Sequence, residues 1–325
     1  MDLRIVSFQE VEAAISEARK AWTETDNYNT HLNSHEAISA VVPEGPHLKH
    51  VKPSFLPGKF SNFASLIMAT QGVEDWHVFE LPRSLAREVA DSYNIWCARG
   101  QLSKETMEDL EGLFPKRTMS GILAESVFNK GLDWFLRLDF CSTKDADGGI
   151  LPVQSISDVV HRLCTSMRGR RALLDFLDED EIQKPKLFVI PFDKNMNPSR
   201  EYRVFCPLPE GRVAAISQYR WTCPFVNGDS TGIDESTQRI FEGGLQMHER
   251  IMRHAGRLKD SSALGTMRSE GFTFDVLLPT QGEVQLVESN PFGAMSGCGS
   301  CLYHWIRDAR LLYGLEEKVE VRIAL

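Results

Sequence analysis

Acidic side chains within residues 272–290 have the spacing of a hairpin that brings them together. The dipeptide Gln281-Gly282 suits a two-residue turn, and such a turn places Asp275 opposite Glu288. Opposed residues on one sheet face have Cβ atoms about 4.5–5.5 Å apart, so these two carboxylates repel each other. The same register pairs Leu277 with Leu286 and Thr273 with Asn290.

This repulsion requires a compensating cation, or a proton held on one carboxyl group. A hard divalent cation bound by Asp275, Glu288 and the side-chain oxygen of Asn290 meets the requirement. Three protein oxygens leave coordination positions open for water and phosphate, as is usual for Mg²⁺ in nucleotide sites. Two other interpretations stay open, namely an edge hairpin with solvated acids and a structural Asp–Arg ion pair. A register slip of one residue would place the acids on opposite faces.

Further predicted strands carry cations among apolar residues. Arg137 shares a strand face with Asp139. Arg203 shares a face with Glu201 in a second strand, and Arg220 follows a third. Cations of this kind suit a triphosphate bridged by a metal ion, while partly buried ion pairs are the alternative for each arginine.

An α+β arrangement must hold these residues. Ser7 and Glu10 form a capping-box pattern that predicts a helix over 7–22, and helical periodicity returns over 82–113. Prolines in residues 26–60 predict an irregular connection between them. After about residue 132, short strands are interrupted by helices and pair with their sequence neighbours. The predicted strands are 134–140, 186–192, 202–206, 213–219, 272–278 and 284–287, and the predicted helices lie near 157–178, 235–256 and 300–313.

Composition narrows the class of protein. The 325 residues carry a formal net charge of −9, which disfavours nucleic-acid binding through a basic surface. No window approaches the roughly 18 consecutive apolar residues of a membrane-spanning helix, and the first residues lack a secretory pattern. Seven scattered cysteines do not form a disulfide framework. We therefore expect a soluble cytoplasmic protein that binds neither nucleic acid nor membranes.

Taken in order, the chemical segments resemble the cell division cycle protein 123 family, which has an ATP-grasp fold. The matching segments lie between about residues 118 and 313. They are Arg137-Leu-Asp-Phe-Cys-Ser-Thr-Lys-Asp-Ala146, Glu201-Tyr-Arg-Val-Phe205, Ile216-Ser-Gln-Tyr-Arg220, Phe274-Asp-Val276, Glu288-Ser-Asn-Pro-Phe292 and Leu302-Tyr-His-Trp305.

The resemblance implies ATP and Mg²⁺ clasped by two α+β subdomains. It divides the chain into an N-terminal region over 1–115, a small subdomain over 116–193 and a large subdomain over 194–325 with the metal site. Asp275, Glu288 and Asn290 are implied to hold the metal ion. The residues implied to contact the nucleotide are Arg137, Lys144, Ile190, Phe192, Asp193, Asp275 and Asn290, and those implied to act on the γ-phosphate or substrate are Arg203, Arg220 and Lys144.

Two functions follow from the resemblance. The first is an ATP-dependent ligase that joins a carboxylate to an amine-type nucleophile through an acyl-phosphate. Glu288-x-Asn290 favours it, because well-known members of the family have Asp at the first position and wider ATP-grasp ligases have Glu. The alternative is an assembly chaperone for eukaryotic translation initiation factor 2 (eIF2), which binds ATP with little turnover. In either case, residues 26–60 and 221–235 are expected to set specificity.

Other motifs predict competing chemistry less well. Gly228-Asp-Ser-Thr-Gly232 matches a hydrolase nucleophile elbow, with Asp275 and His304 following in hydrolase order, but Pro224 and Asn227 disfavour the required strand. Cys298 and Cys301 form a single C-x₂-C beside His304, which is half of a structural zinc site. His31 and His35 lack the zincin spacing, and a P-loop motif is absent.

Overall fold

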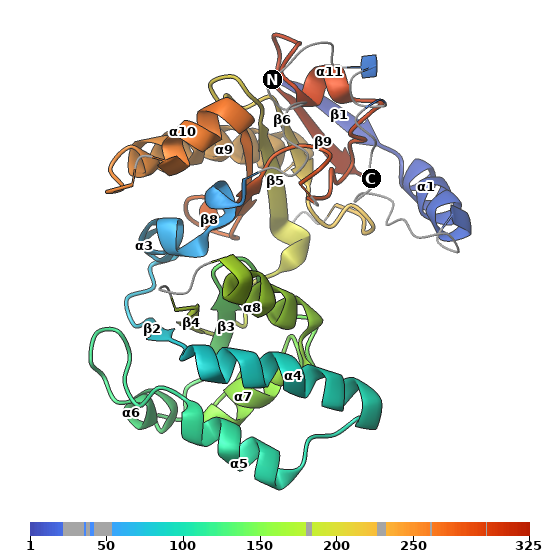
Figure 1. The fold of residues 1–325 in the computed structure, drawn as a ribbon. Helices are drawn as coiled ribbons and strands as arrows, with labels where there is room; N and C mark the ends of the chain where they lie inside the picture. The colour runs from blue at the N-terminus through green and yellow to red at the C-terminus, as the bar shows by residue number, and fades with distance from the viewer. Residues whose placement is uncertain are drawn as a thin grey trace. The chain divides into compact units, whose positions relative to one another are not determined.

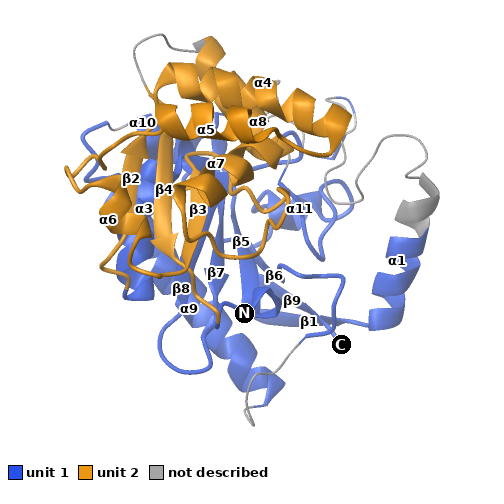
Figure 2. Ribbon diagram, turned by 90° about the horizontal axis from the view of Figure 1, so that it is seen from below, with its two compact units in different colours: residues 1–72, 195–325 blue, residues 73–194 orange. Residues whose placement is uncertain are grey.

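The computed structural model describes residues 1–21, 36, 40–41, 54–179, 184–225, 232–260, 262–296 and 298–325. The chain forms two compact units, drawn in different colours in Figure 2. Unit 1 comprises residues 1–72 and 195–325, and unit 2 comprises residues 73–194. The region predicted over 1–115 is therefore divided between the two units, whereas the boundary predicted after 193 lies beside the observed one.

Unit 1 contains a six-stranded sheet in the order β1-β9-β6-β5-β7-β8. Strands β1, β9 and β6 are parallel, and the remaining neighbours are antiparallel. Figure 1 shows β5 and β6 with β9 and β1 beside them. The strands are β1 (Asp2–Val6), β5 (Glu201–Cys206), β6 (Ala215–Gln218), β7 (Phe272–Leu277), β8 (Gln285–Pro291) and β9 (Glu320–Ala324).

The two faces of this sheet have different coverings. Helix α9 packs against one face so closely that a Cβ on Gly243 would lie 2.2 Å from Val284 Cγ2, and one on Gly244 would lie 3.1 Å from Ile216. The opposite face carries the polar residues of the candidate site. The helices of unit 1 are α1 (Phe8–Ala21), η3 (Leu56–Gly58), α3 (Phe60–Gln71), η4 (Pro198–Arg200), α9 (Ile233–Ala255), α10 (Ser262–Glu270) and α11 (Ala309–Leu312).

Helix α3 closes the β8 edge of the sheet with side chains. Thr70 Oγ1 accepts a hydrogen bond from Leu286 N at 3.0 Å, and Gln71 Nε2 donates to Leu286 O at 2.7 Å. These contacts satisfy backbone groups that an open edge would leave available for pairing with another strand.

Unit 2 is built on a three-stranded antiparallel sheet in the order β2-β4-β3. One face of this sheet joins the helices in an apolar core that includes Trp134, Leu136 and Val189. The strands are β2 (His77–Glu80), β3 (Trp134–Leu138) and β4 (Lys186–Pro191), and the helices are α4 (Arg83–Arg99), α5 (Lys104–Leu113), α6 (Ala124–Phe128), α7 (Ile156–Thr165) and α8 (Met167–Glu179).

The mixed α+β class is as predicted, but the predicted helix over 300–313 is wrong for most of its length. Only α11 is helical there, because Cys301 has a positive φ of 57° and the His304 ring accepts hydrogen bonds from Ile306 N and Arg307 N. Such local side-chain bonds compete with a regular helix. Elsewhere, the predicted helix over 82–113 is broken into α4 and α5 at Gly100.

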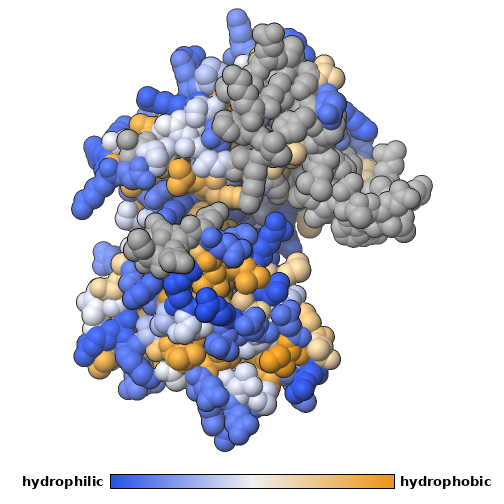
Figure 3. Space-filling view, in the orientation of Figure 1, coloured by the Kyte–Doolittle hydropathy of each residue, from blue (hydrophilic) through white to orange (hydrophobic). Residues whose placement is uncertain are grey.

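Hydrophilic residues cover much of the described surface on the face drawn in Figure 3, with smaller hydrophobic areas between them. Within the described residues, every helix is too short or too polar to cross a membrane.

Candidate functional site

The predicted hairpin forms from β7 and β8, with Asp275 opposite Glu288 and Thr273 opposite Asn290. The predicted pairing of Leu277 with Leu286 is wrong, because Leu277 lies opposite Gln285. The register shifts between Asp275 and Val276, where β8 has an extra residue that forms a bulge. The connection is also longer than the predicted turn, since it runs over residues 278–284. The bulge restores the register, so the acids meet although the turn differs.

Asp275 and Glu288 belong to a row of opposed residues that crosses the whole sheet of unit 1. Because directly opposed residues share a sheet face, these side chains lie on the face opposite α9. From β8 to β1 the row is Glu288, Asp275, Arg203, Ser217, Arg322 and Arg4.

Arg203 holds Asp275 in a buried, two-point ion pair. Arg203 Nε donates to Asp275 Oδ1 at 2.8 Å, and Nη2 donates to Oδ2 at 2.7 Å. The side chains are 6% and 0% exposed. Nη1 donates to Gly299 O at 3.0 Å, and the guanidinium carbon lies 4.9 Å from the ring centroid of Tyr219. The Asp–Arg interpretation of the sequence is therefore present in the structure.

The second acid leaves this group with an excess of negative charge. Burial, together with the nearby carboxylate of Glu288, raises the pKa of Asp275 to about 6 although Arg203 opposes the shift. Two carboxylates and one guanidinium give a formal charge of −1 when both acids are ionised. Asn290 Nδ2 lies 3.2 Å from Glu288 Oε1 and 3.5 Å from Asp275 Oδ2, so the amide donates to both acids.

The donor set fits a hard cation. A carboxylate has about four acceptor positions, and Asp275 accepts two bonds from Arg203 and one from Asn290. The half-buried Glu288 adds a second carboxylate. A cation held by both acids requires the Asn290 amide to turn its oxygen toward them. Among the described residues there is no group of three or more His, Cys, Asp or Glu side chains that could hold a metal, so a cation at this place would need water or phosphate to complete its coordination.

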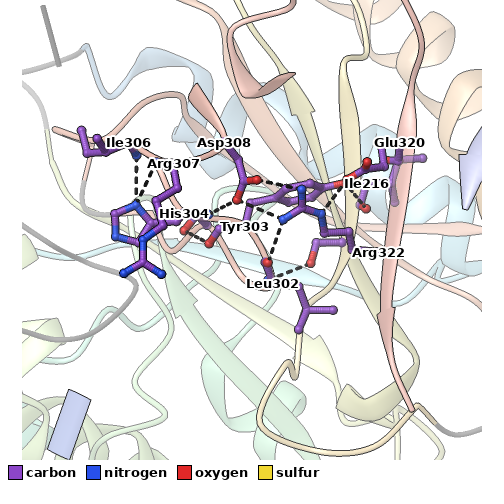
Figure 4. Close-up of polar contacts among 11 residues, drawn as sticks. Ile216, Leu302, Tyr303, His304, Ile306, Arg307, Asp308, Glu320 and Arg322 are labelled. Carbon is purple, nitrogen blue, oxygen red and sulfur yellow. Dashed lines mark hydrogen bonds and ion pairs between the residues drawn. The ribbon is translucent and has the colours of Figure 1, made fainter. Parts of the chain in front are cut away.

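The segment between β8 and α11 is bound to the same row of residues by hydrogen bonds and an ion pair (Figure 4). Leu302 N donates to Ser217 Oγ at 3.0 Å, and Arg322 Nη1 donates to Leu302 O at 3.3 Å. Arg322 also makes a two-point ion pair with Asp308 at 2.7 and 3.0 Å, and its guanidinium carbon lies 4.0 Å from the ring centroid of Tyr303. Since Gly299 of this segment accepts from Arg203, the network supports the Arg203–Asp275 pair.

Sequence reasoning missed Ser217, Arg322 and Asp308. The alternation of Arg322 with Val321 and Ile323 could have indicated a cation in a buried strand, because both apolar neighbours are fully buried. Ser217 lies within the segment 216–220 that carries the family resemblance, but no sequence signal indicated its role, which is to accept a hydrogen bond from the backbone amide of the distant Leu302.

Unit 2 contains the other predicted nucleotide residues. Arg137 on β3 lies opposite Phe188 on β4, and Phe135 lies opposite Ile190. By strand alternation these four residues share the sheet face opposite the apolar core, and Arg137, Phe188 and Ile190 are buried. A cation beside apolar side chains suits the phosphate and purine parts of a nucleotide.

The remaining predicted residues of the site lie near strand ends or on loops. Phe192 directly follows β4, and its backbone N donates to Asp133 O at 2.9 Å. The neighbouring Asp193 is exposed, as is Lys144 in the loop after β3. The exposed Arg220 lies two residues beyond β6, where its carbonyl accepts a hydrogen bond from Gln218 Nε2 at 2.9 Å.

The competing motifs gain no support. Cys298 and Cys301 form no disulfide. Among the described residues, neither these cysteines nor His304 belong to a group of three or more His, Cys, Asp or Glu side chains that could hold a metal ion. His31, His35 and Gly228-Asp-Ser-Thr of the elbow pattern lie outside the described residues.

Comparisons with known proteins identify the fold. No protein-family model and no curated protein matches the chain. Among solved structures, Cdc123 from Schizosaccharomyces pombe matches with a TM-score of 0.51 and 16% identity over 83% of this chain and 96% of that one. A C-terminally truncated form of the same protein matches with a TM-score of 0.51 and 15% identity over 82% and 95% of the two chains. The chain therefore has the mixed α+β fold of Cdc123.

Proposed function

We propose that this chain is an ATP- and Mg²⁺-binding protein of the ATP-grasp class that acts as an assembly chaperone for eIF2. The shared fold with Cdc123 supports the chaperone role. The observation that carries nucleotide binding is the β7–β8 hairpin, where Asp275, Glu288 and Asn290 meet on one sheet face. When bound there, Mg²⁺ would neutralise the β- and γ-phosphates of ATP.

The geometry of Arg203 favours binding over turnover. Phosphoryl transfer is accelerated by cations that stabilise charge on the transferring group. Arg203 already uses its Nε and both Nη atoms for Asp275 and Gly299, so its role is to position Asp275. An arginine that is already engaged in this way fits a protein in which ATP stabilises a binding-competent conformation.

A carboxylate–amine ligase is the second candidate. The pairing of Glu288 with Asn290 near Asp275 is the specific observation in its favour, since this Glu-x-Asn arrangement is the one that the sequence shares with ATP-grasp ligases. Arg220 and Lys144 are exposed, so either side chain is accessible to a substrate.

One experiment separates the two functions. The purified chain is mixed with the gamma subunit of eIF2, with and without ATP and Mg²⁺, and both complex formation and ADP release are measured. A chaperone forms the complex and releases ADP slowly, at a rate that added carboxylates and amines leave unchanged. ADP release that depends on such an added substrate, without binding of the gamma subunit, would instead support the ligase.

The pH dependence of Mg²⁺·ATP binding provides a further prediction. The raised pKa of Asp275, about 6, means that its carboxyl gains a proton as the pH falls through this value and no longer binds a cation. The thermal stabilisation by Mg²⁺·ATP should therefore decrease between pH 7.5 and 5. In the ligand-free protein the effect of Asp275 on folding stability has the opposite pH dependence. A raised carboxyl pKa contributes stability at low pH, and this contribution is lost as the pH rises through about 6. Melting curves over this range, with and without Mg²⁺·ATP, check both signs.

A further inference from the structure

A buried hydroxyl group beside the acidic hairpin has no hydrogen-bond partner. Thr273 lies on β7, two residues before Asp275, and its side chain is fully buried. Thr273 Oγ1 makes no hydrogen bond to any described residue. Within the described part of unit 1, it is the one buried side-chain oxygen or nitrogen atom of which this is true. Because an unpartnered buried hydroxyl destabilises a folded protein, its presence needs an explanation.

Thr273 and Asn290 lie opposite each other on the sheet face that carries the acids. The two residues are directly opposed in the β7–β8 pairing, and Thr273 shares its face with Asp275 because one residue separates them. Directly opposed residues have Cβ atoms about 4.5–5.5 Å apart, a spacing that a short hydroxyl and a short amide can bridge. The pairing of the strands therefore makes the Asn290 amide a suitable partner for this hydroxyl.

In the structure the Asn290 amide is turned toward the acids instead. Asn290 Nδ2 donates to Glu288 Oε1 at 3.2 Å and to Asp275 Oδ2 at 3.5 Å. This orientation suits two carboxylates with excess negative charge, since an amide NH₂ group is a hydrogen-bond donor. With its NH₂ group directed at the acids, the amide leaves Thr273 Oγ1 without a donor.

A cation at the hairpin would reverse the requirement on this amide. A hard cation binds oxygen and is repelled by an NH₂ group, so the amide must turn until Asn290 Oδ1 faces it. The turn takes Nδ2 away from Asp275 and Glu288, and its N–H groups then need another acceptor. A threonine hydroxyl can accept as well as donate, and Thr273 Oγ1 is not engaged by any described residue.

We infer that Thr273 is a positioning residue of the metal site, whose hydroxyl accepts a hydrogen bond from Asn290 Nδ2 when Asn290 Oδ1 binds the cation. The inference rests on the proposed function, in which the cation is Mg²⁺ bound together with ATP. Hydrogen bonds that orient metal ligands are important for binding, and their loss typically lowers metal affinity about 10–100-fold. The unpaired hydroxyl destabilises the protein before the cation binds and is satisfied afterwards, which adds to the affinity.

The substitution Thr273→Val separates this role from a structural one. Valine has the shape of threonine without the hydroxyl, so the variant without ligand should unfold at an equal or higher urea concentration than wild type. Its affinity for Mg²⁺·ATP, measured by isothermal titration calorimetry, should fall about tenfold. Thr273→Ser keeps the hydroxyl and should bind Mg²⁺·ATP with the affinity of wild type.

Thr237→Val is the matched control for these measurements. Thr237 is also fully buried in unit 1, but it belongs to α9, which packs against the opposite face of the sheet. Its hydroxyl has a partner, because Oγ1 donates to Ile233 O at 2.8 Å. Since the same atoms are changed away from the acids, the affinity for Mg²⁺·ATP should be that of wild type.

The possible results distinguish this role from the proposed function itself. Equal affinity of wild type and Thr273→Val would overturn the positioning role and leave the proposed function intact. The same conclusion would follow if Thr273→Val were less stable than wild type without ligand, or if Thr273→Ser bound as weakly as Thr273→Val. Failure of wild type to bind Mg²⁺·ATP would overturn both.

Discussion

The variant Glu288→Gln should lose the thermal stabilisation that Mg²⁺·ATP gives the wild-type protein. A ligand at 100 times its dissociation constant stabilises the folded state by about 2.7 kcal/mol, which raises a melting temperature by several degrees. Glu288 is half-buried, and its replacement by the isosteric amide keeps the size and shape of the side chain, so the fold should be preserved while a charged ligand of the cation is removed.

Glu283→Gln is the matched control for this measurement. Glu283 lies in the connection of the same hairpin, is 86% exposed, and forms an ion pair with Arg250 at 3.7 Å. It should retain the full shift. A Glu288→Gln protein that is stabilised by Mg²⁺·ATP as strongly as wild type would remove the hairpin from the proposed site.

The substitution Arg203→Met should destabilise the protein by about 3–5 kcal/mol, because it leaves the fully buried Asp275 without its ion-pair partner. Urea unfolding followed by a probe in unit 1 measures the loss. Much of it should be recovered in the double variant Arg203→Met with Asp275→Leu, since replacing both members of a buried pair by apolar residues is often neutral.

Arg212→Met provides the comparison with an exposed pair. Arg212 contacts Glu210 at 2.7 Å, but the two side chains are 83% and 63% exposed. Its loss should cost less than about 1 kcal/mol. Equal effects of the Arg203 and Arg212 substitutions would contradict the view that burial makes the Arg203–Asp275 pair important.

The sequence predicts the contents of the site better than its interactions. Strand alternation and one hairpin are enough to bring Asp275 to Glu288, because both depend only on local spacing. The guanidinium that holds Asp275 comes from β5, and no local pattern shows that β5 lies beside β7. The same reasoning found Arg203 but assigned it to phosphate, since the competing carboxylate is 72 residues away.

The parts of the fold that were missed depend on distant pairing. Strand β1 lies beside β9, which is more than 300 residues further along the chain, and neither strand has a neighbour in sequence to pair with. The segment before α11 has apolar residues at helical spacing, but its backbone bonds go to His304 and to Ser217. Hydrophobic periodicity indicates which side chains are buried, but it does not indicate which partners the backbone hydrogen bonds have.

The position of β9 has a consequence for the order in which the protein is made. This strand lies between β1 and β6 inside the six-stranded sheet, yet it is the last of the six to be synthesised. Unit 2 is one continuous stretch that is complete once residue 194 has left the ribosome, so it can fold while translation continues. Unit 1 cannot complete its sheet until β9 has been synthesised, and until then the edges of β1 and β6 that β9 will occupy are open to pairing with other chains. Nascent chains halted before residue 320 are therefore the form of this protein most exposed to aggregation and most in need of cellular chaperones.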